Sequence, residues 1–475
     1  MLLTINTIYK KILTALFISL LLIVVACKKK ETDSTTPTDS DQSGGSLNTS
    51  YDYSSNAFGD PLPTLSDSAL ALHQAGDDLF DDGDDGGTFV PAPAAINPGL
   101  GPIYNNNACG SCHVNDGKGI LPSSADAVSS LLFRLSISGT DPNGGPNPIP
   151  AFGTQLQNKA IPGVMPEGQV SVSYIDSVIA MLDGSTVTLK KPVYTFLNTY
   201  TGLPSQFMYS PRMAPFNFGL GLLEAINEQT LLNFADPNDN NGDSISGRPN
   251  YVYDIASNKT VIGRFGWKAN QSSLMQQTAT AFNQDMGVTS PLIPVKSCYG
   301  QPQYDTSYCT CSPDITSAKV NAVTFYLQTL AVPARRNVND NTVQQGKSIF
   351  IQANCSGCHI PSLTTGSNPF ANIPSLTAQT IQPFTDLLLH DMGPGLADGR
   401  TDYEATGTEW RTAPLWGIGL LQIVNGNTVF LHDGRARSLM EAIMWHSGEA
   451  EKSKQYVRQL SENERNALIT FLQSL

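Results

Sequence analysis

Two short segments containing cysteine and histidine constrain this chain more than any other feature. They are Cys109-Gly-Ser-Cys112-His113 and Cys355-Ser-Gly-Cys358-His359. This spacing is the attachment signature of c-type haem, because each thiol can form a thioether to a haem vinyl group while the adjacent His ligates the iron. A thioredoxin-like pair needs no following His, and zinc needs two further ligands that neither segment offers nearby. We therefore expect two covalently bound c-type haems.

The histidines limit how the two irons can be coordinated. The chain has six, and none lies between His113 and His359. Unless His73 or a methionine folds back, the iron bound by His113 should keep an open face, which implies chemistry on an exogenous ligand. We expect His73 to be a surface or packing residue, with haem ligation as the alternative.

The N-terminus resembles an export signal. Lys10 and Lys11 precede an apolar run from Ile12 to Ala26, which is short for a membrane span and suits a signal peptide over residues 1–26. Val-Val-Ala-Cys27 resembles the lipobox of bacterial lipoproteins, whose Cys is acylated; the alternative is an ordinary secretory signal with a chance Cys. Residues 27–60 are rich in Ser, Thr, Asp and Gly and are expected to be a disordered tether. The body would then be extracytoplasmic, in the periplasm or at the cell surface, and attached to a bacterial membrane by lipid alone.

Charge and composition exclude some classes of protein. A formal net charge of −13 argues against a nucleic-acid-binding protein. The 40 Gly and 31 Pro argue against a simple bundle of long helices.

The C-terminal segment resembles the second domain of the bacterial di-haem cytochrome c peroxidases. That family has an aromatic-x-His-x-Gly turn, here at Phe430 to Gly434, and its C-terminal haem takes a sixth ligand, usually Met, fourteen residues after the turn His. His446 stands fourteen residues after His432, so the resemblance implies His359/His446 coordination and a lower potential than with Met. Met444, His390 and His432 remain alternative ligands.

The same resemblance points to a catalytic pair beside the N-terminal haem. The family places a Gln there and, ten residues later, a Glu; Gln157 and Glu167 have this spacing. A carboxylate over an open iron can move a proton between the two oxygens of peroxide while the Gln orients the peroxide. An ordinary solvated turn is the alternative.

More closely, the chain is similar to the di-haem oxidoreductase family, sometimes called thiol oxidoreductase-like. The matching segments are Pro211 to Pro215, Gly219 to Ile226, Phe265 to Ala269, Asp285 to Gly287, Leu387 to Gly393 and Glu409 to Gly417. The resemblance covers nearly everything from about residue 60 onward. It implies a mainly α fold with two cytochrome-c-like haem domains, long loops and minor β additions.

We expect an enlarged N-terminal haem domain at residues 61–335 and a C-terminal cytochrome c domain at 336–475. The pattern of apolar residues predicts helices at 65–80, 125–136, 219–234, 321–330, 342–352 and 462–475, and a strand at 187–194.

Two further features have open interpretations. Closely spaced oxygen ligands resemble a calcium loop but lack the Glu of an EF-hand, so a plain Asx-rich turn is equally compatible; the residues are Asp236, Asn238, Asp239, Asn241 and Asp243. In an oxidising compartment we expect a disulfide from Cys298 to either Cys309 or Cys311, which leaves one thiol over.

These observations predict an enzyme that reduces hydrogen peroxide, or another small oxidant, at the N-terminal haem. A small redox protein would supply electrons through the C-terminal haem, and one of the four tryptophans could relay them, although core packing is the simpler role for each. The alternatives are a non-catalytic electron carrier and an oxidase of thiols or protein side chains.

Overall fold

The computed structural model describes residues 40–81, 100–121, 130–303, 313–367 and 370–475. The predicted signal peptide, Cys27, Cys309 and Cys311 lie outside these ranges. Within them, no helix combines the length and apolar character needed to cross a membrane.

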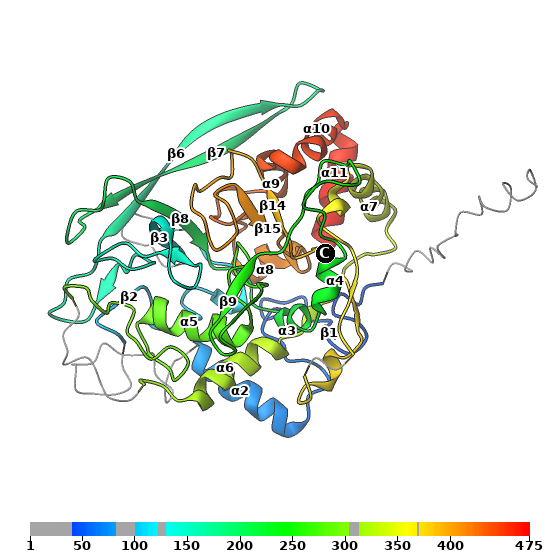
Figure 1. Ribbon diagram of the computed structural model, residues 1–475. Coiled ribbons are helices and arrows are strands. Elements are labelled where there is room, and N and C mark those ends of the chain that lie inside the picture. The colour runs from blue at the N-terminus through cyan, green and yellow to red at the C-terminus, as the bar shows by residue number, and fades with distance from the viewer. Residues whose placement is uncertain (1–39, 82–99, 122–129, 304–312, 368–369) are drawn as a thin grey trace, which may run out of the picture. The chain divides into compact units, whose positions relative to one another are not determined.

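The helices are short and scattered along the chain (Figure 1). They are α2 (Asp67–Asp81), α3 (Leu220–Glu224), α4 (Glu228–Leu232), α5 (Leu274–Met286), α6 (Ser317–Thr329), α7 (Asn341–Gln352), α8 (Leu421–Asn425), α9 (Leu439–Trp445), α10 (Glu451–Gln459) and α11 (Glu462–Ser474). Side-chain caps set several starting points. Asp340 accepts hydrogen bonds from two amides at the start of α7, and Ser461 forms a capping box with Glu464 at the start of α11.

Each Cys-x-x-Cys-His segment follows one helix of a crossing pair. α2 precedes the first segment and packs on α6, and α7 precedes the second and packs on α11 (Figure 1). A glycine permits each close approach. A Cβ on Gly76 of α2 would lie 2.3 Å from the carbonyl oxygen of Ala322, and one on Gly346 of α7 would lie 2.0 Å from that of Ala467. Neither helix pair could therefore pack this closely with a larger residue at the crossing.

The strands form several small sheets. They are β1 (Thr49–Ser50), β2 (Ile103–Tyr104), β3 (Leu131–Thr140), β4 (Pro146–Asn147), β5 (Lys159–Ala160), β6 (Gln169–Ala180), β7 (Thr186–Leu197), β8 (Met208–Met213), β9 (Tyr251–Asp254), β10 (Lys259–Ile262), β11 (Val332–Pro333), β12 (Leu363–Thr364), β13 (Thr380–Ile381), β14 (Leu389–Asp391) and β15 (Glu409–Arg411). β3 pairs antiparallel with β8 and with β4. β6 and β7 form a long antiparallel hairpin that runs toward α10 in Figure 1.

The tip of this hairpin is fastened to the C-terminal helices. The Leu182 amide donates to the carbonyl oxygen of Arg458 at 3.0 Å, and Arg465 of α11 forms an ion pair with Asp183 at 2.6 Å. Farther along β7, the Lys190 amide donates to the carboxylate of Glu441 in α9. Residues from the middle of the chain are thus held against its C-terminal part.

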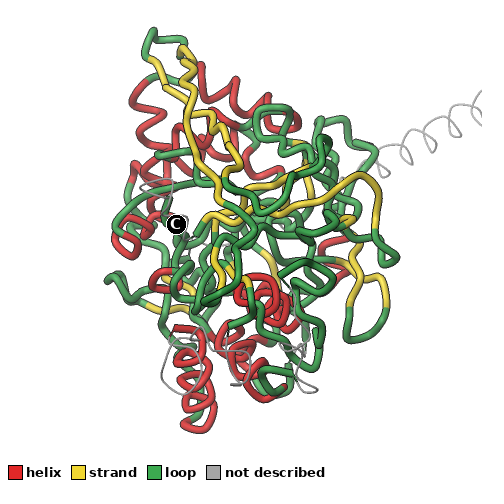
Figure 2. Tube along the Cα trace, turned by 90° about the vertical axis from the view of Figure 1, so that its left-hand side faces the viewer, coloured by secondary structure: helices red, strands yellow, loops and turns green. Residues whose placement is uncertain are grey.

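The expected mainly α fold is wrong. The structure is 28% helix and 21% strand, and Figure 2 shows long stretches of loop between the elements. The error lies largely in residues 131–213, which supply β3 to β8. In β3, Leu131, Phe133 and Leu135 are buried while Leu132 and Arg134 are partly exposed. That two-residue period is the signature of a strand, so the predicted helix at 125–136 is wrong where the structure describes it.

A cavity shared by both Cys-x-x-Cys-His segments

One cavity of about 410 Å³ is lined by both motifs. The first contributes Cys109, Cys112 and His113, and the second contributes Cys355, Cys358 and His359. The volume falls in the range of ordinary ligand and cofactor sites. Two segments that lie far apart in the sequence therefore face a common space.

Backbone turns place the thiols and the imidazole of each motif together. The amides of Cys112 and His113 both donate to the carbonyl oxygen of Cys109 at 2.9 Å, and the His359 amide donates to that of Cys355 at 3.0 Å. Cys109, Cys355 and Cys358 are free thiols, and the Cys112 sulfur accepts a hydrogen bond from the Asn106 side-chain amide at 3.0 Å. Burial raises the pKa of Cys112 and of Cys355 to about 12, so these thiols are protonated at neutral pH.

Three imidazoles lining the cavity share one hydrogen-bonding pattern. Nδ1 of His113 donates to the carbonyl oxygen of Pro215 at 2.7 Å, and Nδ1 of His359 donates to that of Phe384 at 2.9 Å. Nδ1 of His446 donates to the carbonyl oxygen of Ala442 at 2.7 Å. Metal-ligating histidines typically carry such a bond, because it fixes the tautomer that leaves the Nε2 lone pair for the metal.

The electrostatics of these three histidines agree with that role. Burial lowers the pKa of His113 and of His359 to about 4, and it also lowers the pKa of His446. All three rings are therefore neutral at neutral pH, as a metal ligand must be. His446 reaches the cavity because α9 ends at Trp445 and the backbone then turns extended.

The alternative ligands named from the sequence differ in their surroundings. Nδ1 of His390 lies 2.7 Å from a Glu449 carboxylate oxygen, and Nε2 lies 2.8 Å from one of Asp386. Burial alone would lower the pKa of His390, but Cys358 and Asp386 raise it well above its ordinary value. Both ring nitrogens are thus engaged. Met444 is buried but does not line the cavity.

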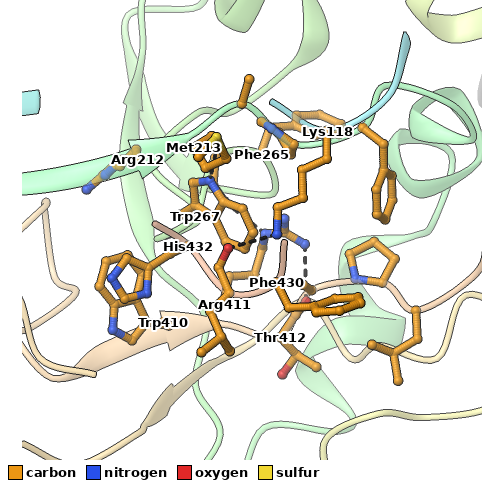
Figure 3. A pocket seen from close by; sticks show the side chains of 18 of the residues that line it. Lys118, Arg212, Met213, Phe265, Trp267, Trp410, Arg411, Thr412, Phe430 and His432 are labelled. Carbon is orange, nitrogen blue, oxygen red and sulfur yellow. Dashed lines mark hydrogen bonds between the residues drawn. The ribbon is translucent and has the colours of Figure 1, made fainter. Parts of the chain in front are cut away.

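His432 has a different character again. Its ring stacks on Trp410 with 3.7 Å between centroids (Figure 3), and its buried Nε2 has no hydrogen-bond partner. It lines the cavity and so remains a possible ligand or proton carrier. His73 does not line it; its Nδ1 lies 2.8 Å from the Thr329 hydroxyl, as expected for a packing residue.

Two cations in the cavity wall, the buried Lys118 and the half-buried Arg411, form no ion pair with a carboxylate of the described residues. Lys118 donates to the carbonyl oxygen of Leu431 at 2.9 Å, and Arg411 donates to those of Gly266 and Thr412. Figure 3 shows the two side chains converging in the cavity. Burial lowers the pKa of Lys118 to about 7. An anionic ligand would offset the free-energy cost of burying these positive charges, and the carboxylates of haem are anions of this kind.

Gln157 and Glu167 are together, as their proposed pairing requires, but they do not line the cavity. The Gln157 amide donates to a Glu167 carboxylate oxygen at 2.6 Å, and the Glu167 amide returns a bond to the Gln157 carbonyl. The Gln157 side chain donates to the carbonyl oxygen of Gln284, next to Asp285, which does line the cavity. Burial raises the pKa of Glu167 well above its ordinary value.

The expected calcium loop uses its oxygens to close its own turns. Carboxylate oxygens of Asp236 accept bonds from the amides of Asn240 and Asn241, and Asp243 accepts one from Ile245. No cluster of three His, Cys, Asp or Glu side chains suited to a metal ion occurs among the described residues. Calcium binding stays a prediction from sequence. Cys298 is a buried free thiol, and its expected pairing cannot be followed because its partners lie outside the described ranges.

Reasoning from sequence missed the roles of Lys118 and Arg411. Arg411 falls in a segment that carried the family resemblance, but nothing in the sequence indicates that its partners are carbonyl groups. Lys118 lies five residues after His113, and a buried cation so close to a haem motif is the one signal that could have identified it.

Comparison with known proteins completes the assignment. A comparison with curated proteins found no match. Among solved structures, hydrazine synthase of Kuenenia stuttgartiensis, pressurised with 20 bar xenon, is 20% identical with a TM-score of 0.24, and the match covers 39% of this chain and 65% of that chain. A likeness this weak carries no argument. Residues 37–475 match the family described as "Di-haem oxidoreductase, putative peroxidase". Since this match spans nearly the whole chain and confirms the resemblance seen in the sequence, the chain belongs to the di-haem oxidoreductase family.

Proposed function

We propose that this protein is an extracytoplasmic, lipid-anchored di-haem c-type enzyme that reduces hydrogen peroxide to water at the haem bound by His113. Electrons from a small redox protein would enter through the haem bound by His359. The observation that carries the proposal is that both motifs line one cavity together with His446. The imidazoles of His113, His359 and His446 are neutral, and Nδ1 of each donates to a carbonyl oxygen.

The chain's own residues hold the cofactors in this proposal. The four motif cysteines form the thioether links, and His113 and His359 ligate the two irons. His446 is the sixth ligand of the second iron, because its Nε2 is left free by the bond from Nδ1 to Ala442. Lys118 and Arg411 bind haem carboxylates. When bound, the haems supply one-electron chemistry and an iron position that accepts peroxide.

Glu167 and Gln157 handle protons behind the cavity wall. A buried carboxyl with a raised pKa can hold a proton at neutral pH. Hydrogen bonds link it through Gln157 to Gln284, the neighbour of the cavity residue Asp285, so we assign the pair a proton-supplying role rather than contact with the iron. Replacing Glu167 by Gln tests this role and should preserve haem content.

An electron carrier is the second candidate, and His432 favours it. The residue lines the cavity, and its Nε2, 3.7 Å from an Asp433 carboxylate oxygen, has no hydrogen-bond partner among the described residues, so it could close the open iron position. Electron paramagnetic resonance of the purified ferric protein distinguishes the two functions. A high-spin signal beside a low-spin one supports the peroxidase, whereas two low-spin signals contradict it and support the carrier.

Steady-state assays separate peroxide reduction from oxidation of thiols. Peroxide consumption should be sustained by a reduced small cytochrome and should not be sustained by a thiol alone. Peroxide consumption that a thiol sustains and a reduced cytochrome does not would contradict the peroxidase and support a thiol oxidase. Mass spectrometry of the secreted protein tests the remaining parts of the proposal, since it reports two covalent haems and an acylated Cys27.

A further inference from the structure

A row of aromatic rings leads away from the first haem motif. The ring centroids of His113 and Phe80 are 5.9 Å apart, and those of Phe80 and Tyr326 are 5.4 Å apart. Phe80 comes from α2 and Tyr326 from α6, the helix pair that lies side by side in Figure 1. Both rings are buried, and Phe80 lines the cavity. Tyr326 is thus one ring removed from a predicted iron ligand.

Carboxyl groups surround the Tyr326 hydroxyl. It donates a hydrogen bond to Oδ1 of Asp116 at 2.8 Å, and Asp77 is a second side-chain partner. Burial and these carboxyls raise the pKa of Tyr326, so the phenol is protonated at rest. An acceptor for the phenolic proton is therefore already in place at hydrogen-bond distance.

The tryptophans of the same region have the opposite surroundings. Three of the four have a cation over the ring at 4.6 to 5.3 Å; the pairs are Lys118 with Trp267, Lys268 with Trp410, and Arg435 with Trp445. Removing an electron from Trp267 would place positive charge against Lys118. Asp398 and Asp433 pair with the cations at Trp410 and Trp445, but among these rings only the Tyr326 hydroxyl has carboxyl partners that can take its proton as the electron leaves. Trp416 and Trp445 do not line the cavity. Oxidation near the cavity is therefore directed toward the tyrosine.

We propose that Tyr326 is a redox-active residue that is oxidised to the neutral tyrosyl radical during turnover of peroxide. Its electron passes across Phe80 to the one-electron oxidant that peroxide generates at the N-terminal haem, and its O–H proton moves onto the hydrogen-bonded carboxyl pair. Reducing one peroxide to two waters takes two electrons and two protons; Tyr326 supplies one electron and the haem pair the other, while solvent supplies both protons because the phenolic proton stays on the carboxyl pair. This inference rests on the proposed function. Tyr326 would hold an oxidising equivalent whenever the redox partner has not delivered an electron.

The test is electron paramagnetic resonance of the haem-loaded ferric protein, frozen shortly after hydrogen peroxide is added. We expect a radical signal whose line shape changes when the protein contains ring-deuterated tyrosine. The signal should be lost in Tyr326→Phe and in Phe80→Leu, which keeps the phenol but removes the intervening ring. Tyr194→Phe is the matched control. Tyr194 is partly buried and also donates to a carboxylate, that of Asp433, but Arg435 neutralises this carboxylate through a 2.8 Å ion pair.

A signal that persists in Tyr326→Phe, or that disappears equally in Tyr194→Phe, would overturn the inference. So would the absence of any tyrosyl signal while peroxide is consumed. A photogenerated ruthenium oxidant used in place of peroxide separates this inference from the proposed function. A Tyr326 radical formed by ruthenium, in protein that does not consume peroxide, would support the redox-active tyrosine and refute the peroxidase; no radical with either oxidant would refute the tyrosine.

Discussion

Replacing Lys118 by Met should change the stability of the haem-free and haem-loaded protein in opposite directions. Lys118 is 6% exposed, and its ammonium has a carbonyl oxygen as acceptor. In the absence of haem, the Asp433 carboxylate offsets only part of the cost of burying this charge. With haem bound, we propose that a haem carboxylate supplies that balance.

The magnitude for the haem-free chain follows from the pKa. Burial lowers it from 10.5 to about 7, and each pKa unit corresponds to about 1.4 kcal/mol, so the buried ammonium costs about 5 kcal/mol at acidic pH. Substitution by Met removes this cost of about 5 kcal/mol, but it also leaves the Leu431 carbonyl without its hydrogen-bond donor, which destabilises the protein by about 2 kcal/mol. We therefore expect Lys118→Met to raise the free energy of unfolding of the haem-free protein by about 3 kcal/mol below pH 7.

The effect should depend on pH with a defined sign. Between about 7 and 10.5, the unfolded chain binds the Lys118 proton and the folded chain does not. The stability of the haem-free wild-type protein therefore rises with pH across this window as the buried charge is lost. Lys118→Met should remove that rise of about 5 kcal/mol, so its advantage of about 3 kcal/mol over wild type is lost by about pH 9 and becomes a deficit of about 2 kcal/mol near pH 10.5.

Urea titrations followed by circular dichroism measure these differences, with Lys259→Met as the control at an exposed lysine of β10. In the haem-loaded protein, the same Lys118 substitution should lower the melting temperature, because a haem carboxylate loses its counter-charge. If Lys118→Met destabilises both forms equally, the ammonium is not an uncompensated charge in the haem-free state, and the reasoning is refuted.

Three further predictions follow from the site and the helix pairs. Replacing His446 by Ala should convert the C-terminal haem to high spin in electron paramagnetic resonance without loss of haem, and Met444→Leu should leave the spectrum unchanged; a spectrum altered only by the second substitution would exchange the two assignments. Glu167→Gln should slow peroxide turnover by about two orders of magnitude at unchanged haem content, and an unaltered rate would remove Glu167 from the mechanism. Gly346→Ala should destabilise the protein by roughly 1–3 kcal/mol in urea titrations because its Cβ meets backbone, whereas Gly202→Ala, in open space, should stay within about 0.5 kcal/mol of wild type; equal effects would contradict the packing argument.

The helices that frame the haem motifs were predictable because their signals are local. The predicted helices at 65–80, 321–330, 342–352 and 462–475 correspond to α2, α6, α7 and α11 within a few residues. Each combines apolar residues at helical spacing with a nearby cap or stop. The expected strand at 187–194 is confirmed within β7 for the same reason.

Elements that depend on distant partners were not predictable in the same way. β3 is held by β8, whose strand begins at Met208, and an apolar run such as Leu131 to Leu135 fits a helix as readily when that partner is unknown. The predicted helix at 219–234 is interrupted where Ile226 forms a β-bridge with Thr365, and Asn227 then starts α4 from an extended backbone. In both places a tertiary contact overrode a local preference.

For the site, the sequence by itself determined the residues of the two Cys-x-x-Cys-His motifs, the family and the short set of possible sixth ligands. Such features follow from spacing along the backbone, which covalent geometry sets. Only the tertiary structure decided that both motifs line one cavity, that Nδ1 of His446 bonds to a carbonyl while both nitrogens of His390 face carboxylates, and that Lys118 is buried and Arg411 half-buried beside carbonyl groups. These properties depend on which distant atoms approach a side chain, and burial, charge balance and hydrogen bonding exist only once the chain has folded.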